Sequence, residues 1–290
     1  MQYKKITRIT KKKKSTTVYN FHVPGLENYV ANGVVTHNCY VARRKGYANP
    51  ITLYSNRDQM IAAWKRHLSK LPMKQPHQTH ATLWTYDLGC NNDISVDASA
   101  CETPRILIEH FRDTRALASF ATKYVNRDML AYDPQLHTRI RFSLMPEKLR
   151  KVVDVSTSST SAKIEAADEF VRAGYEVHFN FSPIIFVEDS KQLWVELFEE
   201  LNDKLSDQTK AQAAAELIML THNADLHELN ERWHPRAEAL LWRPDLQEAK
   251  TSRNGQKNIR YDYRFKAECL RLFREMLAQH CPWMRIRYAF

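Results

Sequence analysis

The sequence predicts an α/β fold built on a parallel sheet, and three observations predict it. Strand-like apolar runs alternate along the chain with segments of helical periodicity, which is typical of parallel sheets with right-handed helical crossovers. The chain has 290 residues, of which 43% are hydrophobic and 26% charged, and this suits a globular protein with a sizeable core. Five strand–helix units are visible, so the sheet is expected to form a barrel or part of one.

The expected strands are short runs rich in β-branched and aromatic residues. They lie at 81–89, 117–125, 139–145, 177–187 and 215–221. The expected helices show apolar residues at helical spacing and lie at 57–71, 104–114, 161–174, 190–205 and 224–233. The last run, 282–290, is expected to be a closing strand. In barrels, chemistry gathers at the C-terminal strand ends, and four residues lie there: Cys90, Lys123, Ser143 and Ser182.

Charge and cysteine content narrow the class of protein. The net charge of +10 favours a polyanionic partner such as nucleic acid. No run approaches 18 consecutive apolar residues, and no signal-peptide pattern follows the basic N-terminus, so neither a membrane span nor secretion is expected. The cysteines are odd in number and widely spaced, which indicates free thiols in a reducing cytoplasm. They are Cys39, Cys90, Cys101, Cys269 and Cys281.

Residues 1–38 differ from the rest of the chain. They hold seven lysines and arginines against one acid, so they carry +6 of the net charge of +10. The runs "TTVYNFHV" and "NYVANGVV" are typical of short strands, with turns at Pro24-Gly25 and Asn32-Gly33. A few short strands cannot bury a core alone, so this segment is expected to need a partner. A solvated basic tail or a nucleic-acid-binding arm is the alternative.

The stretch "VYNFHVPGLENYVANGVVTHN", followed by Cys39, resembles the C-terminal end of an intein. The resemblance places His37 at the family's penultimate histidine, Asn38 at its terminal asparagine and Cys39 at its downstream nucleophile. It implies that the Cys39 thiolate takes over an upstream chain. The Asn38 amide then attacks its own backbone carbonyl, with His37 as hydrogen-bond or proton donor. Asn20 and Glu27 depart from the family's usual residues.

Two accounts fit the expected intein fragment at 1–38. It is either the C-terminal half of a split intein, joined in trans to a separately made N-terminal half, or an artificial truncation of a longer gene. The charge of +6 favours the first account, because a basic segment is steered toward an acidic partner. Association with the partner half is therefore expected to slow in high salt.

A second resemblance covers most of 39–290. Its motifs are "CY" at 39–40, "DLGCNND" at 87–93, "ATKY" at 121–124, "RIRFS" at 139–143, "KIEAADEFVRAGYEVHFNFSPII" at 163–185 and "ELI" at 216–218. These are similar to the spore photoproduct lyase family of radical S-adenosylmethionine enzymes. The resemblance implies a partial (β/α)6 barrel that lacks its first strand in this chain. It divides the chain into the fragment at 1–38, the barrel at 39–222 and C-terminal helices and closing strands at 223–290.

The resemblance also implies cofactors and residues that hold them. The family binds a [4Fe–4S] cluster through C-x3-C-x2-C followed by Tyr, and Cys39-Tyr40 matches the third position. The other two cysteines are expected on the N-terminal half, so this half alone is expected to be inactive. Tyr40 is a candidate hydrogen relay and Cys90 matches the hydrogen donor. S-adenosylmethionine is expected to be held at Lys123 and Ser143, which match, and near Asn92 and Ser182, which depart from the family's Ser and Ala.

Each of these residues also has a purely structural interpretation. A free cysteine such as Cys90 is usually a small buried side chain. Lys123 can snorkel from a strand end. Ser143 and Ser182 can satisfy local backbone groups.

The resemblance implies reversal of thymine-dimer photolesions in DNA by hydrogen abstraction with a 5′-deoxyadenosyl radical. The stretch 251–266 interleaves basic and aromatic side chains that suit phosphates and exposed bases. The candidates are Arg253, Lys257, Arg260, Tyr261, Tyr263 and Arg264. An edge strand with a solvated basic face is the alternative. Two other functions stay open: a radical enzyme of the same family with another substrate, and an inactive truncated nucleic-acid-binding protein.

Overall fold

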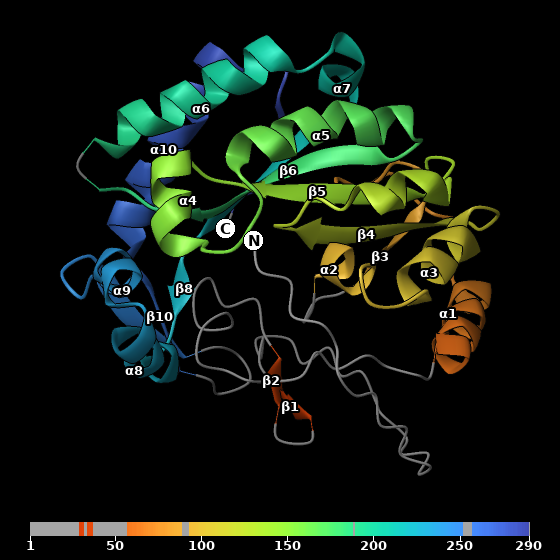
Figure 1. Ribbon diagram of the computed structural model, residues 1–290, viewed down its shortest axis with the longest axis horizontal. Helices are drawn as coiled ribbons and strands as arrows, with labels where there is room; N and C mark the ends of the chain where they lie inside the picture. Colours follow the sequence, from red (N-terminus) through yellow and green to blue (C-terminus); the bar gives the residue numbers. More distant parts are fainter. Residues whose placement is uncertain are drawn as a thin grey trace.

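The structure, a computed structural model, describes residues 29–31, 34–36, 57–88, 93–187, 189–251 and 257–289. Its main sheet has six parallel strands in the order β11-β7-β6-β5-β4-β3. They are β3 (Trp84–Asp87), β4 (Ala116–Thr122), β5 (Thr138–Leu144), β6 (Glu176–Ile184), β7 (Ala214–Met219) and β11 (Arg285–Ala289). The sheet curls into a half-barrel with helices outside it (Figure 1). The predicted parallel sheet, its five strands and the closing strand are confirmed.

The five helices that the apolar spacing predicted are present. They are α1 (Arg57–Lys70), α3 (Thr103–Phe111), α5 (Thr160–Arg172), α6 (Ser190–Lys204) and α8 (Ala224–Trp233). The structure has further helices whose bounds the sequence pattern did not predict: α2 (Ile94–Asp97), η1 (Arg127–Tyr132), α4 (Glu147–Val153), α7 (Asp207–Gln212), α9 (Pro235–Leu241) and α10 (Tyr263–His280). Most of these span two turns or fewer, which is too short for a periodic pattern to stand out.

The hydrophobic core lies between the outer side of the sheet and the helices. Phe181 of β6 packs against Trp194 and Phe198 of α6 and against Phe273 of α10, with ring centroids 5.3–6.1 Å from its own. All four aromatic side chains are fully buried. This aromatic cluster holds α6 and α10 against the middle of the sheet, so the strand positions are fixed from outside.

The C-terminal part of the chain forms a small second sheet and then returns to the first. Strands β8 (Thr221–His222), β10 (Lys257–Tyr261) and β9 (Gln247–Thr251) pair antiparallel in that spatial order. The stretch 251–266 is not one edge strand, as the alternative interpretation had it. Helix α10 begins at Tyr263, because the carboxylate of Asp262 accepts the backbone N–H groups of Arg264 and Phe265 and caps the helix.

Little of the segment at 1–56 is described. Strands β1 (Tyr29–Ala31) and β2 (Val34–Thr36) pair antiparallel, with Tyr29 opposite Thr36, as the turn signal at Asn32-Gly33 predicted. The expected strand at 16–23 lies outside the described residues, and an all-β intein fragment is not shown. Seven site residues also lie outside them: His37, Asn38, Cys39, Tyr40, Cys90, Asn92 and Arg253. Within the described ranges, no helix has the length and hydropathy needed to cross a membrane.

Candidate functional site

The inner face of the half-barrel is polar, although it is almost as buried as the outer face. Side chains alternate between the two faces of a strand, and parallel pairing sets Arg141 beside His178 and Ser143 beside Asn180. The same register sets Asn180 beside Glu216. The inner face is therefore lined by Arg139, Arg141, Ser143, Glu176, His178, Asn180, Ser182 and Glu216.

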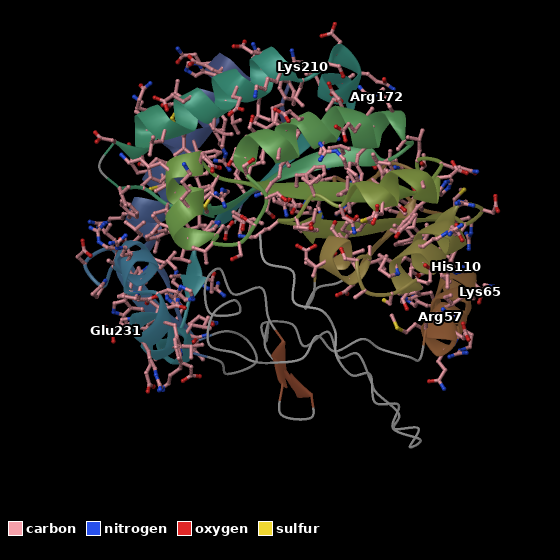
Figure 2. The ribbon with its side chains drawn as sticks, in the orientation of Figure 1. Arg57, Lys65, His110, Arg172, Lys210 and Glu231 are labelled. Atoms are coloured by element: carbon pink, nitrogen blue, oxygen red, sulfur yellow. The ribbon has the colours of Figure 1, made fainter. Side chains whose placement is uncertain are left out.

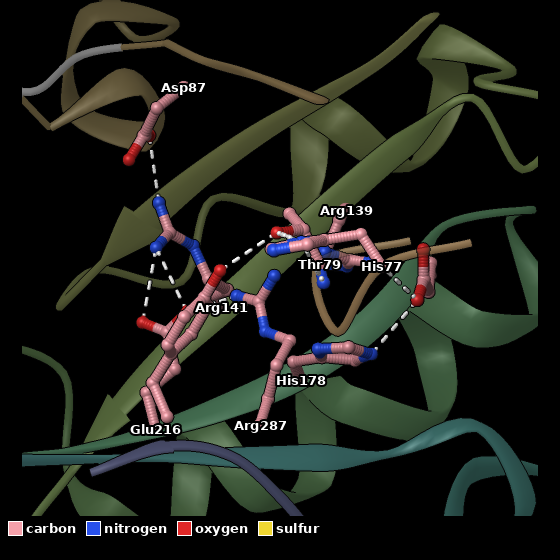
Figure 3. Close-up of polar contacts among 10 residues, drawn as sticks. His77, Thr79, Asp87, Arg139, Arg141, His178, Glu216 and Arg287 are labelled. Carbon is pink, nitrogen blue, oxygen red and sulfur yellow. Dashed lines mark hydrogen bonds and ion pairs between the residues drawn. The ribbon is translucent and has the colours of Figure 1, made fainter. Parts of the chain in front are cut away.

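An ion-pair network joins four strands across the middle of this face (Figure 3). A guanidinium nitrogen of Arg141 lies 3.2 Å from the Glu216 carboxylate, and its other terminal nitrogen lies 2.8 Å from Asp87. Arg287 of β11 donates to the same Glu216 carboxylate. Buried charges of this kind are stable only when they compensate one another. The network therefore fills the centre of the half-barrel with charges that compensate one another, although the Nε atoms of Arg141 and Arg287 donate to no described partner.

A second group of charges lies nearer the amino ends of the strands. Arg139 Nη2 donates to Glu176 Oε1 at 2.8 Å, and His178 Nε2 lies 2.9 Å from the same oxygen. Burial lowers the pKa of His178 to about 4, so its ring is neutral at pH 7. Burial alone would raise the pKa of Glu176, but hydrogen bonds from His178 and Arg139 and the positive charge of Arg139 hold it at about 2.

The segment before β3 closes this end of the half-barrel. Thr79 Oγ1 and the hydroxyl of Tyr288, on β11, share a hydrogen bond at 2.8 Å, and His77 Nδ1 shares another of 2.8 Å with Thr79 Oγ1 (Figure 3). Burial lowers the pKa of His80, which also feels the charges of Glu176 and Arg139. The amino end is thus covered by protein, and a ligand is expected at the opposite end of the strands.

The carboxyl end of the inner face holds the three described residues that the sequence placed at a cofactor. Lys123 directly follows β4, Ser143 is the penultimate residue of β5, and Ser182 lies near the end of β6. Both serines are buried and Lys123 is half-buried. Beside Ser143, the side-chain oxygen of Asn180 is buried and accepts no hydrogen bond from the described residues. An unsatisfied buried acceptor is costly, so this end is suited to a polar ligand.

Three charged residues that the sequence analysis missed hold this end in place. Both carboxylate oxygens of Asp154 accept from Lys123 Nζ at 2.6 Å. The Asp93 carboxylate accepts from the Lys123 backbone N–H at 2.9 Å. Lys163 Nζ donates to the Ser143 carbonyl at 2.9 Å. Lys163 could have been found from the sequence, because it falls among the apolar residues of the buried stripe of α5, one turn before Ala167. Asp154 and Asp93 lie at the ends of short helices that show no apolar periodicity.

The described nucleic-acid candidates lie on β10 and at the start of α10, and they differ in exposure. Lys257, Arg260 and Arg264 are exposed, and Tyr263 is 76% exposed. Tyr261 is only 2% exposed, and its ring packs on Phe265. The prediction that Tyr261 stacks on a base therefore lacks support, because its ring belongs to the core. Tyr261 is less exposed than the other candidates because it lies on the inward side of β10.

Basic side chains also gather away from these candidates. On α1, Lys65, Arg66 and Lys70 are exposed, and Figure 2 shows Lys65 and His110 close together at the edge of the molecule. Burial lowers the pKa of His110, and the charge of Lys65 lowers it further. The positive charge of the chain is thus spread over more than one surface.

The described cysteines do not form a metal site. Cys269 and Cys281 are buried, and burial raises the pKa of each thiol to about 12, which disfavours the thiolate that iron needs. Cys101 is half-buried. Within the described ranges, no group of three or more His, Cys, Asp or Glu side chains is arranged to hold a metal ion. A cluster would have to use residues outside them, as the expectation for Cys39 requires.

Together, the fold and this site define a class: a parallel α/β half-barrel whose polar ligand end lies at the carboxyl ends of its strands. Comparison with known proteins gives the family. The sequence profile of "Spore photoproduct lyase" matches residues 11–290. The chain belongs to the spore photoproduct lyase family. The match begins inside the segment interpreted as an intein fragment, and the comparisons give no support for an intein.

The relatives are distant but cover most of the chain. The spore photoproduct lyase of Geobacillus sp. (strain Y412MC61) is 26% identical over 258 residues, 87% of this chain and 72% of the relative. That of Bacillus subtilis (strain 168) is 25% identical over 207 residues, 71% of this chain and 58% of the relative. The chain thus spans well under the full length of both.

Solved structures agree on the fold. A cysteine-to-serine mutant of spore photoproduct lyase superposes with a TM-score of 0.76 at 23% identity, covering 88% of this chain and 73% of that one. Another mutant, solved with bound S-adenosylmethionine and dinucleoside spore photoproduct, gives a TM-score of 0.72 at 22% identity, covering 82% and 68%. At this identity the likeness establishes the half-barrel fold.

Proposed function

We propose that this chain forms the larger part of a radical S-adenosylmethionine lyase that reverses thymine-dimer lesions in DNA. Family membership gives the reaction class. The observation that carries the proposal is the division of the inner face. Among the described residues, its middle is filled by charges that pair with one another and leaves only guanidinium donors of the arginines unpartnered, whereas its carboxyl end has a buried acceptor, the Asn180 side-chain oxygen beside Ser143, that no described donor reaches.

The residues at this end fit S-adenosylmethionine. The molecule carries a carboxylate, an amino group, ribose hydroxyls and adenine nitrogens. Lys123 offers an ammonium group, Ser143 and Ser182 offer hydroxyls, and Asn180 offers both an amide donor and an unsatisfied acceptor. When bound with the cluster, S-adenosylmethionine supplies the radical that abstracts hydrogen. The contribution of this chain is to bind and orient it and to exclude water.

The iron–sulfur cluster is proposed to use Cys39 as one ligand. Tyr40 would lie beside it, and Asn92 would contact S-adenosylmethionine. Cys90, three residues after the end of β3 at Asp87, would return a hydrogen atom to the product. A reducing cytoplasm suits both the free thiols and the cluster. Because Cys269 and Cys281 are buried with raised pKa values, Cys39→Ala in a protein that also carries the other two cluster cysteines should abolish the cluster's absorption band, whereas Cys281→Ala should keep it.

DNA is proposed to bind at the β9–β10 hairpin. Lys266 of α10 is half-buried, and its pKa is lowered by burial and by the nearby charges of Arg260 and Lys250. These three cations from three elements form one basic cluster, to which the exposed Lys257, Arg264 and Tyr263 add. Arg253, which lies outside the described residues, is proposed to contact DNA as well. Such a cluster can neutralise phosphates while the exposed Tyr263 ring stacks on an extruded base.

The test uses a chimera in which residues 39–290 follow the segment of the Bacillus subtilis relative that carries its first two cluster cysteines. With S-adenosylmethionine and a reductant, it should lower the number of lesions in irradiated DNA, counted by mass spectrometry after digestion. Lys123→Met in the same chimera should slow this at least tenfold. Cleavage of S-adenosylmethionine with an unchanged lesion count would indicate another substrate. No cleavage at all would refute the reaction class.

We further propose that residues 1–38 act as a C-terminal split-intein fragment, joined in trans to a separately encoded N-terminal half. The support is the contiguous His37-Asn38-Cys39 and the basic charge of the segment. Cys39→Ala should block ligation but still allow release of residues 1–38 through Asn38, which is read by mass spectrometry after mixing the halves. Asn38→Ala should block the release. Unimpaired ligation by Cys39→Ala would remove the proposal.

A further inference from the structure

Two buried charged residues lie behind the proposed cofactor contacts, and the proposed function gives neither of them a role. Asp154, at the C-terminal end of α4, is 1% exposed, and Lys163, on α5, is fully buried. Asp154 accepts from the ammonium group of Lys123 with both carboxylate oxygens, and Lys163 donates to the backbone carbonyl of Ser143. Each is thus bonded to one of the two residues expected to hold S-adenosylmethionine.

The two residues also interact electrostatically with each other. Burial lowers the pKa of Lys163 to about 8, and the charge of Asp154 opposes this shift. The other charges that face Lys163 are Lys123 and Arg150, which lower its pKa, and Asp93, which raises it. Asp154 is therefore the carboxylate that favours the charged form of Lys163 most. Removing one member of a buried ion pair leaves its partner without compensation, so Asp154 keeps the ammonium group of Lys123 paired inside the protein.

The backbone holds Asp154 in place independently of Lys123. Its N–H donates to the Arg150 carbonyl at 2.9 Å, and its own carbonyl accepts from the Thr157 hydroxyl at 2.6 Å. The Ser158 N–H, a short distance along the same loop, donates to the Lys123 carbonyl at 3.1 Å. The loop after α4 therefore fixes both the main chain and the ammonium group of Lys123.

We propose that Asp154 and Lys163 are positioning residues for S-adenosylmethionine: Asp154 fixes the Lys123 ammonium group, and Lys163 fixes the Ser143 end of β5. This inference rests on the proposed function. A lysine side chain has four rotatable carbon–carbon bonds, and ordering it on ligand binding costs up to about 2 kcal/mol. Holding the ammonium group in place beforehand removes much of that cost. The partners of groups that touch a ligand typically change affinity by about 10- to 100-fold.

The first experiment is a double-mutant cycle on S-adenosylmethionine binding, measured by titration calorimetry with the 290-residue chain. Asp154→Asn should weaken binding about tenfold. Lys123→Met should weaken it at least as much, and the double variant should bind no more weakly than Lys123→Met alone, because Asp154 acts through Lys123. If Asp154→Asn has no effect, or keeps its full effect in the Lys123→Met background, the role of Asp154 is refuted.

The second experiment tests Lys163 by pH. Its charged form should be lost as the pH rises through about 8, which weakens the hydrogen bond to the Ser143 carbonyl. Wild-type affinity for S-adenosylmethionine should therefore fall more steeply from pH 7 to 9 than that of Lys163→Met. The ligand's own titration is common to both proteins and cancels in the comparison. Identical profiles would refute the role of Lys163.

A third measurement separates this inference from the proposed function, because it needs no cofactor. The Lys163 ammonium group can be titrated by NMR of the isotopically labelled chain. Asp154→Asn should lower its midpoint below the wild-type value of about 8. An unchanged midpoint refutes the proposed network. If the wild-type chain binds no S-adenosylmethionine, the proposed function fails, and the positioning role in cofactor binding fails with it.

The matched control is Asp168→Asn. Asp168 is also a carboxylate with several hydrogen bonds, accepting from Ser206 and Thr209, but it lies on the outer side of α5. The substitution should lower the thermal midpoint and leave both S-adenosylmethionine affinity and the Lys163 titration unchanged. A loss of affinity in this control equal to that in Asp154→Asn would show that general destabilisation accounts for the effect.

Discussion

The two faces of the six-stranded sheet are formed by alternate residues of the same strands, yet one face is mainly apolar and the other is polar. Apart from Thr138, the outer face of β5 and β6 has fully buried apolar side chains: Ile140, Phe142, Leu144, Val177, Phe179 and Phe181. The inner face has arginine, glutamate, histidine, asparagine and serine between these positions. The outer face provides the hydrophobic stabilisation. The inner face holds buried charges at a free-energy cost, which is justified if it positions groups for a ligand.

The outer face should show the largest effect of a single change. Phe181→Ala leaves a cavity among Trp194, Phe198 and Phe273. It should lower the free energy of unfolding by about 3–5 kcal/mol, measured by urea denaturation. Phe181→Leu, which keeps most of the volume, should cost much less. A loss below 1 kcal/mol for Phe181→Ala would mean that this aromatic cluster does not hold the helices to the sheet.

The central ion network should be the next most sensitive. Glu216→Gln removes the charge that compensates Arg141 and Arg287 but keeps the size of the side chain. We expect a loss of about 3 kcal/mol, because two guanidinium groups lose their shared partner. The double variant Glu216→Gln, Arg287→Met should recover part of the loss. If the double variant is less stable by the sum of both single effects, the groups do not act as one network.

The inner face should also make the protein acid-sensitive. His178 has a pKa of about 4 in the folded chain against an ordinary value of 6.5, so the unfolded chain binds the proton more tightly. Stability is then full above pH 6.5 and falls as the pH drops toward 4, by roughly 2–3 kcal/mol. In His178→Asn this fall should be smaller between pH 6.5 and 4.5, above the range in which Glu176 titrates, and His80 and His110, whose pKa values burial also lowers, account for what remains. Parallel stability curves for the two proteins would contradict the burial of a neutral ring.

A surface ion pair gives the smallest effect and serves as the reference for the inner face. Arg127 on η1 and Glu169 on α5 lie 2.6 Å apart, but the arginine side chain is largely exposed. Arg127→Ala should change the free energy of unfolding by about 0–1 kcal/mol and should leave S-adenosylmethionine binding unchanged. A cost as large as that of Glu216→Gln would show that burial is not what distinguishes the inner network.

The fold could be predicted from the sequence because the apolar residues of the outer face and of the helices repeat at short, regular spacings along the chain. Runs such as "RIRFS" alternate apolar and polar residues, and α5 repeats apolar residues every three to four positions. Helix α10 was missed because the strand-like alternation of the run "IRYDYRF" at 259–265 hid the cap at Asp262. Short capped helices such as α4 give no periodic signal.

The inner face was only partly accessible, because its partners are distant in sequence. Arg141 and Glu216 lie 75 residues apart, and Arg139 and Glu176 lie 37 apart. Sequence alone cannot pair such charges without the register of the sheet. Lys123 and Ser143 were placed at strand ends by the sequence pattern, and the family resemblance gave them a role. The contacts of Asp154 and Lys163 with these two residues depend on the fold, which brings the strand ends, α5 and the loop after α4 together.

The most direct test of the account is hydrogen exchange of the 290-residue chain with and without S-adenosylmethionine, resolved by peptide. The account predicts that the ligand protects the strand ends around Lys123, Ser143 and Ser182, together with the loop at Asp154. Peptides of α8 and α9 should exchange at the same rate in both samples. Protection confined to other parts of the chain, or no protection at saturating ligand, would contradict the claim that the carboxyl end of the inner face binds the cofactor.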